Sequence, residues 1–395
     1  MYVKMFAVLF VISFSALCSA QLPKEAYVTV PQLISSAGYP VEKYRVTTAD
    51  GYILQIFRIP AGRRTARKTG SAKGKKAVLL MHGLMGCSSN FLIMGPERSL
   101  GYLLADAGYD VWLGNLRGNS NTAHKNLTRA DPQFWKFSLD EHGKYDLPAI
   151  IDKVLEVTGL EKILYIGHSM GTTSFFVMMS EKPEYNEKIV AFVALAPAVY
   201  LANNKAVIEW IVKDMNLINR MKAQGLLSSN LFDNMWKIIS NNACRMKRPQ
   251  ENLCVQVISL VMGEDNDQLD MDMLPVCVAR VQPGSWQQYE HYAKIALTDV
   301  FTAWEDGLNG AVRPYKLTNV RVPVVLVYGE NDRLTEKSQV LRLADELRAN
   351  GVLEEIKAAK PKINHIDFIF AKDISTIINK PLIKTVHNLY NKYGS

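Results

Sequence analysis

A serine between two glycines is the feature of this sequence that could carry chemistry. Gly167-X-Ser169-X-Gly171 follows a short apolar run at 163–166 and precedes a second one at 175–179. Three fixed residues can also recur by chance, so these flanking runs give the motif its weight. They predict a buried strand, a sharp turn and a helix, an arrangement typical of a nucleophile elbow. The helix would aim its first amides at the site, so the pattern favours nucleophilic catalysis of acyl transfer.

A serine hydroxyl needs a base to take its proton, and the base needs a partner that orients it. Asp332 and His365 each follow a late run that predicts a strand. The order Ser169, Asp332, His365 is the one expected behind such an elbow. We therefore predict a nucleophile, an orienting acid and a base in that order. Glu330 and Asp367 are rival acids, but Glu330 lies nearer the strand and Asp367 follows the histidine itself.

The other histidines compete with His365 for the role of base. His168 is expected to point away from the serine, and His82 to make a structural hydrogen bond ahead of the site. The remaining histidines lie off any late strand-end loop: His124, His142, His291 and His387. The chain has no His-x3-His or Cys-x2-Cys spacing and no glycine-rich nucleotide loop, so we expect neither a metal ion nor a cofactor.

A site for the developing oxyanion is predicted at the elbow and at a loop upstream of it. The apolar run 77–81 is expected to be a strand buried on both faces. His82-Gly83-Leu84-Met85-Gly86 follows it, and a glycine-rich loop in this position supplies one backbone amide. We predict the N–H groups of Leu84 and Met170 as the two donors.

These side chains require a scaffold of alternating strands and helices. Asp50-Gly51 lies between two alternating runs and predicts a hairpin, and Asp146 is expected to cap a helix that has Pro148 in its first turn. A helix is also expected at the end of the chain. Strands are expected at 44–47, 53–58, 77–81, 110–114, 163–166, 189–195, 323–328 and 354–358. This alternation predicts an α/β fold with a mostly parallel sheet and helices on both faces.

The alternation stops between 197 and 313, where helical apolar patterns replace strands. Long insertions between sheet strands normally lie over the strands' carboxyl ends. We therefore predict a helical cap or lid over residues 197–313, inserted between two parts of the core, 21–196 and 314–395. The cap is rich in methionine, which adapts its shape and would suit long acyl chains.

The first residues predict the compartment. Residues 1–20 have a basic start, an apolar stretch and the small residues Cys18-Ser19-Ala20, as in a secretory signal peptide, and no segment is long enough to span a membrane. Of the four later cysteines, Cys244 and Cys254 are the preferred disulfide pair; the remaining two are Cys87 and Cys277, and other connectivities stay open. Asn126-Leu127-Thr128 is a glycosylation sequon.

The chain has a formal net charge of +8, and seven of its basic residues fall between 61 and 76 with no acid among them. The run contains Gly and Ser but no aromatic residue, so a solvated loop is favoured over a nucleic-acid site. Such a loop could also attract anionic lipid surfaces.

Several segments along the chain together carry a family resemblance. These are Gly38-Tyr39-Pro40, 48–54, His82-Gly83-Leu84, 110–115, Arg117-Gly118-Asn119, 137–141, 144–148, 167–171 and 364–368. With them the sequence resembles the animal acid lipase family of the α/β-hydrolase superfamily, the gastric and lysosomal lipases and their insect relatives. The resemblance implies an α/β-hydrolase core with a helical cap, the triad and oxyanion donors named above, and a cap disulfide. Met170 stands where vertebrate members usually carry glutamine.

A serine ester hydrolase is therefore the leading hypothesis. It would be a secreted or lysosomal lipase that cleaves neutral lipids, such as triacylglycerols or sterol esters, at a lipid–water interface through an acyl-enzyme on Ser169. One alternative is a carboxylesterase or acyltransferase for more soluble esters. Another is a lipid-binding or storage protein that keeps the scaffold without the catalysis.

Overall fold

The computed structural model of the chain describes residues 22–64, 75–201, 240, 243–264, 267–359 and 363–394. The predicted signal peptide lies outside these residues. So do part of the basic run and the helical patterns expected in the first third of the cap, between 207 and 239.

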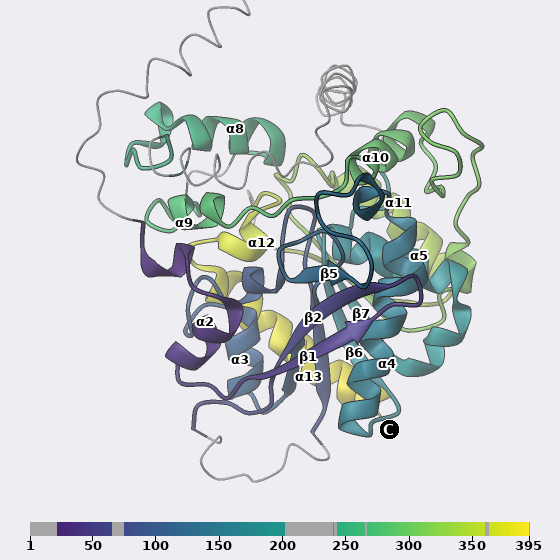
Figure 1. The fold of residues 1–395 in the computed structure, drawn as a ribbon, viewed down its shortest axis with the longest axis horizontal. Helices are drawn as coiled ribbons and strands as arrows, with labels where there is room; N and C mark the ends of the chain where they lie inside the picture. The colour runs from purple at the N-terminus through teal and green to yellow at the C-terminus, as the bar shows by residue number, and fades with distance from the viewer. Residues whose placement is uncertain are drawn as a thin grey trace, which may run out of the picture.

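The described strands form one nine-stranded sheet in the order β1-β2-β4-β3-β6-β7-β8-β9, with β5 paired to β2. The sheet lies in the centre of the molecule (Figure 1). All pairs from β4 to β9 are parallel, and β1, β2 and β5 add antiparallel strands at one edge. The strands are β1 Glu42–Thr47, β2 Tyr52–Ile59, β3 Ala77–Met81, β4 Asp110–Leu113, β5 Thr122–His124, β6 Ile163–His168, β7 Ile189–Leu195, β8 Val324–Tyr328 and β9 Leu353–Ala358. The predicted hairpin and mostly parallel sheet are confirmed.

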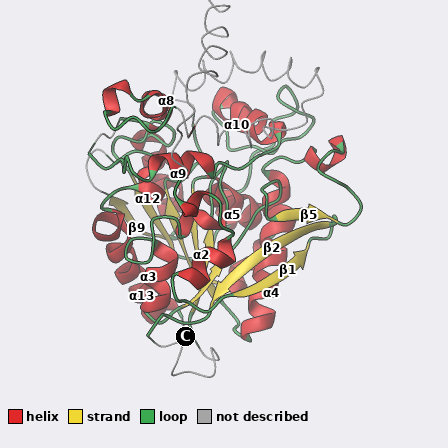
Figure 2. Ribbon diagram, turned by 60° about the vertical axis from the view of Figure 1, so that its left-hand side comes forward, coloured by secondary structure: helices red, strands yellow, loops and turns green. Residues whose placement is uncertain are grey.

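Helices cover both faces of this sheet because its central strands are apolar on both sides. Every residue of β3, β4, β6, β7 and β8 is buried. The helices are α2 Val30–Ser36, α3 Leu100–Asp106, α4 Leu147–Thr158, α5 Met170–Glu181, α8 Leu253–Met262, α9 Leu274–Ala279, α10 Trp286–Thr298, α11 Lys337–Ala349, α12 Asp367–Phe370 and α13 Lys380–Tyr393. α4, α5 and α11 pack in one apolar cluster, while α2, α3 and α13 pack in the other, against the opposite face (Figure 2).

The predicted capping role of Asp146 is wrong. Its side chain makes no capping bond at the start of α4. Instead the Asp146 carboxylate accepts two hydrogen bonds from Arg117: one from its backbone N–H, at 3.0 Å, and one from its guanidinium, at 2.9 Å. A π-helical turn, His142–Asp146, runs directly into α4, so the helix has no free first turn at this point. The buried guanidinium of Arg117 gives the carboxylate charge-assisted hydrogen bonds, which are stronger than bonds from neutral amides.

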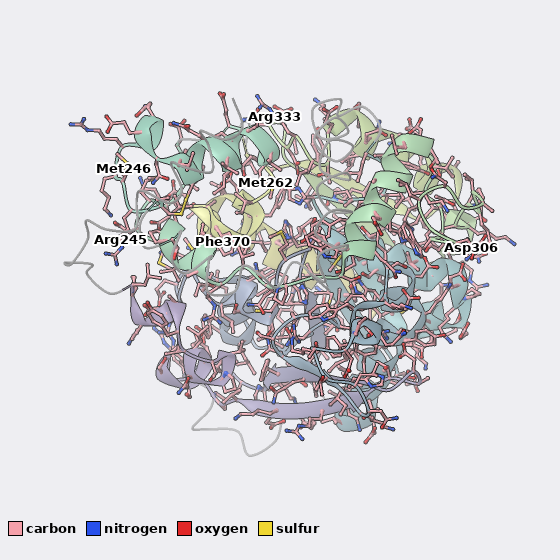
Figure 3. The ribbon with its side chains drawn as sticks, turned by 45° about the horizontal axis from the view of Figure 1, so that its top comes forward. Arg245, Met246, Met262, Asp306, Arg333 and Phe370 are labelled. Atoms are coloured by element: carbon pink, nitrogen blue, oxygen red, sulfur yellow. A yellow bond between two sulfur atoms is a disulfide. The ribbon has the colours of Figure 1, made fainter. Side chains whose placement is uncertain are left out.

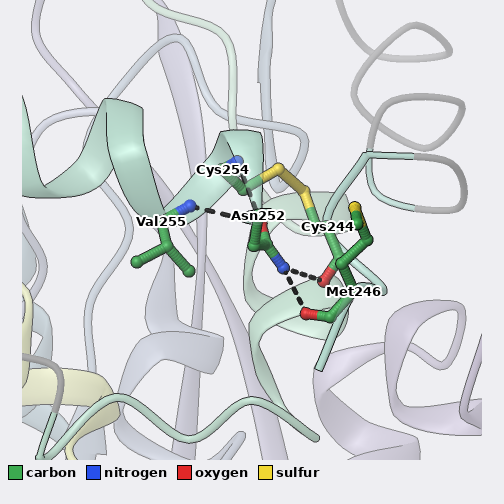
Figure 4. The surroundings of a disulfide bond; sticks show 5 residues. All are labelled: Cys244, Met246, Asn252, Cys254 and Val255. Atoms are coloured by element: carbon green, nitrogen blue, oxygen red, sulfur yellow. Dashed lines mark hydrogen bonds between the residues drawn. A yellow bond between two sulfur atoms is a disulfide. The ribbon is translucent and has the colours of Figure 1, made fainter. Parts of the chain in front are cut away.

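The segment between β7 and β8 contributes α8, α9 and α10, which lie together at one end of the molecule (Figure 1). A disulfide joins Cys244 to Cys254 at the start of α8, and the Asn252 side chain caps that helix by accepting from the N–H groups of Cys254 and Val255 (Figure 4). The thiols of Cys87 and Cys277 are buried and unpaired. Among the described residues, no helix combines the length and apolarity needed to cross a membrane.

Candidate active site

Ser169 lies at the turn between β6 and α5, with backbone angles φ +50° and ψ −116°. A positive φ is unusual for a residue with a side chain and costs on the order of 1–3 kcal/mol, so the surrounding structure must impose it. The turn is imposed by its anchors: the N–H of Ser169 donates to the carbonyl of Leu195 on β7, and the Ser169 carbonyl accepts from Thr172. The predicted elbow therefore has the backbone geometry that exposes a side-chain hydroxyl at a strand end.

The two glycines of the elbow are required by close backbone contacts. A Cβ at position 167 would lie 2.7 Å from the carbonyl carbon of Gly171, and a Cβ at position 171 would lie 2.5 Å from the carbonyl oxygen of Met81. Both neighbours are backbone atoms in tightly held elements, so neither can move aside cheaply. The glycines let α5 begin directly against β6 and β3.

We expect Gly171→Ala to destabilise the protein by about 3 kcal/mol, because the added methyl group overpacks the contact between α5 and β3. Urea unfolding would measure the loss. Gly159→Ala is the matched control: Gly159 has φ +69° and open space around it. Its replacement should therefore cost only the left-handed backbone penalty of about 1–2 kcal/mol. A loss at Gly171 no larger than that at Gly159 would contradict the steric explanation.

The structure brings together the three side chains predicted from the sequence. His365 Nε2 lies 2.8 Å from Ser169 Oγ, and His365 Nδ1 lies 2.8 Å from Asp332 Oδ2. The three residues come from loops after β6, β8 and β9, which are separated in sequence but end at the same edge of the sheet. This arrangement lets the imidazole accept the serine proton at one nitrogen while the carboxylate holds the proton at the other.

The carboxylate of Asp332 is buried and fully hydrogen-bonded. Its Oδ1 accepts from the N–H groups of Leu334 and Thr335, each at 2.8 Å, and the Thr335 hydroxyl donates to Oδ2 at 2.6 Å. Burial alone would raise the pKa of Asp332, but His365 and these donors outweigh it, so the pKa lies below its ordinary value. Asp332 is therefore the charged partner of the imidazole.

Neither rival carboxylate takes this position. Glu330 accepts from the ammonium group of Lys337 at 3.3 Å near the surface. Asp367 accepts from the backbone N–H of Asn364 at 2.8 Å, which braces the loop that carries the histidine. The sequence-based preference for Asp332 agrees with this geometry.

His168 is buried and donates from Nε2 to the carbonyl of His365, at 3.1 Å. Burial, reinforced by His365, lowers the pKa of His168 to about 3, so this imidazole stays neutral. It therefore supports the backbone of His365 and does not contact the serine through a hydrogen bond. Three other histidines bond elsewhere: His124 to Asp50, His291 to Thr302, and His142 to side chains that are described below.

The loop after β3 lies directly against the serine. A Cβ on Gly83 would be 3.1 Å from the Ser169 Cβ, so Leu84 follows a residue in contact with the nucleophile. His82 has the structural role expected of it: Nδ1 donates to the Gly83 carbonyl at 2.8 Å, and Nε2 accepts from the Leu116 N–H at 3.1 Å. Burial lowers the pKa of His82 to about 4, which keeps this pattern intact.

Sequence reasoning missed a residue that joins the loops of the acid and the base. The carbonyl of Met262, at the end of α8, accepts from the backbone N–H of Arg333 and from that of His365, each at 3.3 Å. Met262 and Arg333 are labelled in Figure 3. The next carbonyl, that of Gly263, accepts from the Asn364 side chain at 2.8 Å. No sequence motif marks these bonds, because the partners lie about 70 and 100 positions away.

The fold defines the α/β-hydrolase class. Residues 76–371 match the family described as alpha/beta hydrolase fold, and residues 30–95 match a partial alpha/beta-hydrolase lipase region. A solved structure of an epoxide hydrolase from Vigna radiata has the same fold with a TM-score of 0.51 at 15% identity, covering 89% of this chain and 98% of that one.

Curated relatives narrow the class. Lipase 3 of Drosophila melanogaster is 37% identical over 90% of this chain and 92% of its own length. The gastric triacylglycerol lipase of Bos taurus is 36% identical over 88% of each chain. The chain belongs to this lipase family of the α/β-hydrolases.

Proposed function

We propose that the chain is a lipase that hydrolyses carboxylic esters of neutral lipids, such as triacylglycerols or sterol esters. The observation that carries the proposal is the pair of 2.8 Å contacts that link Ser169 to His365 and His365 to Asp332. The lipase names of the relatives support the substrate class.

The chemistry follows from this geometry. Ser169 Oγ attacks the ester carbonyl carbon while His365 Nε2 takes the hydroxyl proton. The carbonyl oxygen becomes an oxyanion that the N–H groups of Leu84 and Met170 stabilise. When the intermediate collapses, the ester bond breaks and His365 returns the proton to the departing alcohol. Water, activated by the same imidazole, then releases the fatty acid and restores the serine.

The segment 197–313 would act as the cap that receives the acyl chain. Neutral lipids are insoluble, so the enzyme would work at a lipid–water interface. The Cys244–Cys254 disulfide favours an oxidising compartment, in agreement with the predicted signal peptide and with secretion or lysosomal delivery. Asn126 is exposed after β5, where a glycan could be attached.

The substrate class can be tested by measuring fatty-acid release from emulsified trioleate and from a short soluble ester, between acidic and neutral pH. We expect hydrolysis of the emulsion, and a rise in rate when the short ester exceeds its solubility limit. The Ser169→Ala protein serves as the blank in every assay. A rate that saturates below the solubility limit, with no hydrolysis of the emulsion, would favour an esterase for soluble substrates and overturn the lipase assignment.

A further inference from the structure

A buried polar contact ties α10 to the residue that follows the nucleophile. The side-chain amide of Gln288 donates from Nε2 to the thioether sulfur of Met170, at 3.3 Å. Both side chains are only 2% exposed. A buried amide is costly unless each of its groups finds a partner, so its remaining contacts reveal what holds it there.

Both ends of the Gln288 side-chain amide have hydrogen-bond partners. Its Oε1 accepts from the backbone N–H of Ser285 at 2.8 Å, which fixes which end of the amide carries the nitrogen. Its Nε2 also lies 3.3 Å from Nε2 of His142. Because the amide can only donate there, this histidine nitrogen must be the acceptor, and the imidazole proton lies on Nδ1.

The chain of contacts then returns to Met170. His142 Nδ1 lies 3.5 Å from Ser174 Oγ, and this hydroxyl donates to the carbonyl oxygen of Met170 at 2.8 Å. Burial and the positive charge of Arg117 lower the pKa of His142, so the imidazole stays neutral as the pattern requires. Met170 is therefore held at two points, its sulfur and its carbonyl, by one connected set of buried groups.

The turn that carries His142 lies very close to α5. A Cβ on Gly143 would be 2.5 Å from the Val177 side chain and 2.6 Å from the backbone nitrogen of Met178. The π-helical turn 142–146 therefore packs directly against α5, and His142 also contacts Gln288 of α10. π-helical turns of this kind are frequent at functional sites.

We propose that Gln288 is a positioning residue that acts with His142 and Ser174 to hold Met170, so that the Met170 N–H faces the oxyanion. This inference rests on the proposed serine-hydrolase function and extends it to residues outside the triad. A hydrogen-bond donor stabilises the transition state only if it is oriented before charge develops. Gln288 lies in the predicted cap, and it would then serve catalysis from outside the α/β core.

Gln288→Glu is the sharpest variant, because it keeps the acceptor for Ser285 and the size of the side chain but removes both donors. We expect kcat for a short soluble ester to fall about tenfold, a fraction of the effect of deleting an oxyanion donor, while KM changes less than about twofold. A trifluoromethyl ketone forms a tetrahedral adduct on the nucleophilic serine. Its inhibition constant should rise by the same factor as kcat falls.

Tyr292→Phe is the matched control. Tyr292 lies one turn further along α10, and its hydroxyl forms a hydrogen bond with Thr173 on α5 at 2.8 Å. Loss of the Tyr292 hydroxyl should weaken the contact between α10 and α5, while kcat stays within about twofold of the wild type. An equal loss of kcat in the two variants would show that only helix packing matters and would overturn the proposal.

Ser174→Ala tests the second anchor if Gln288→Glu does not fold, because alanine favours the helix. We expect kcat to fall about fivefold and the inhibition constant to rise equally. Unchanged values in either folded variant would overturn the positioning role. A wild-type protein that neither hydrolyses esters nor is labelled at Ser169 by a fluorophosphonate would overturn the proposed function as well, so the two failures are distinguishable.

Discussion

Replacing Ser169 with alanine is expected to lower kcat for ester hydrolysis by about 10⁶-fold, to the level left by substrate binding and the oxyanion site alone. The reason is that Ser169 Oγ, 2.8 Å from the imidazole of His365, is the only atom of the elbow side chain that can attack the ester. Alanine keeps the Cβ at the strained φ of +50°, so the backbone cost stays the same and the fold should be retained. Fatty-acid release and fluorophosphonate labelling would measure the loss.

Ser36→Ala provides the control for this substitution. Ser36 is an exposed serine in α2 whose hydroxyl donates to the Leu33 carbonyl of its own helix. Activity and the melting temperature should both stay at wild-type values in this variant. Residual hydrolysis by Ser169→Ala at one per cent of the wild-type rate would show that another residue supplies the nucleophile.

Replacing Asp332 with asparagine is expected to lower kcat by about 10⁴-fold, the effect of fixing the wrong imidazole tautomer. Oδ1 accepts from two backbone N–H groups, so the amide oxygen of asparagine must take that place. The amide nitrogen then faces His365 Nδ1 and donates to it, which moves the imidazole proton to Nε2. A protonated Nε2 cannot accept the proton of Ser169.

The same variant tests the charge of Asp332. The carboxyl group has a depressed pKa in the folded protein, so its contribution to stability is present above its unfolded pKa of about 4 and is lost as pH falls through the folded value. The stability difference between wild type and Asp332→Asn should therefore narrow as pH falls below about 4. Melting temperatures recorded between pH 3 and 7 would show it, and a gap independent of pH would contradict a charged Asp332.

The sheet and the triad could be predicted because their causes are local. Each buried strand is a short apolar run, and the elbow is set by two glycines around Ser169. Loops after parallel strands share an edge, so the order of the serine, acid and base was enough to place them together. Contacts between distant segments leave no such pattern. Nothing near Asp146 shows that Arg117 will take its carboxylate.

The apolar pattern of α8 illustrates the same limit. Val257 and Leu260 are spaced as in a core-facing helix, yet they are 54% and 64% exposed. Spacing reveals that a helix has an apolar side but not which neighbour, if any, covers it. Likewise, the roles of Met262 and Gln288 depend on partners far away in the sequence, and neither residue type suggests a hydrogen bond to the site.

The hydrogen bonds accepted by Met262 have a consequence for how new specificities can arise in this scaffold. An engineered or natural exchange of the whole inserted segment would replace the Met262 carbonyl, which bonds to both the loop of Asp332 and the loop of His365. A transplanted segment must therefore place backbone carbonyls where those of Met262 and Gly263 lie. Exchange of such segments between proteins is therefore constrained at the end of α8, where the segment meets the loops of Asp332 and His365.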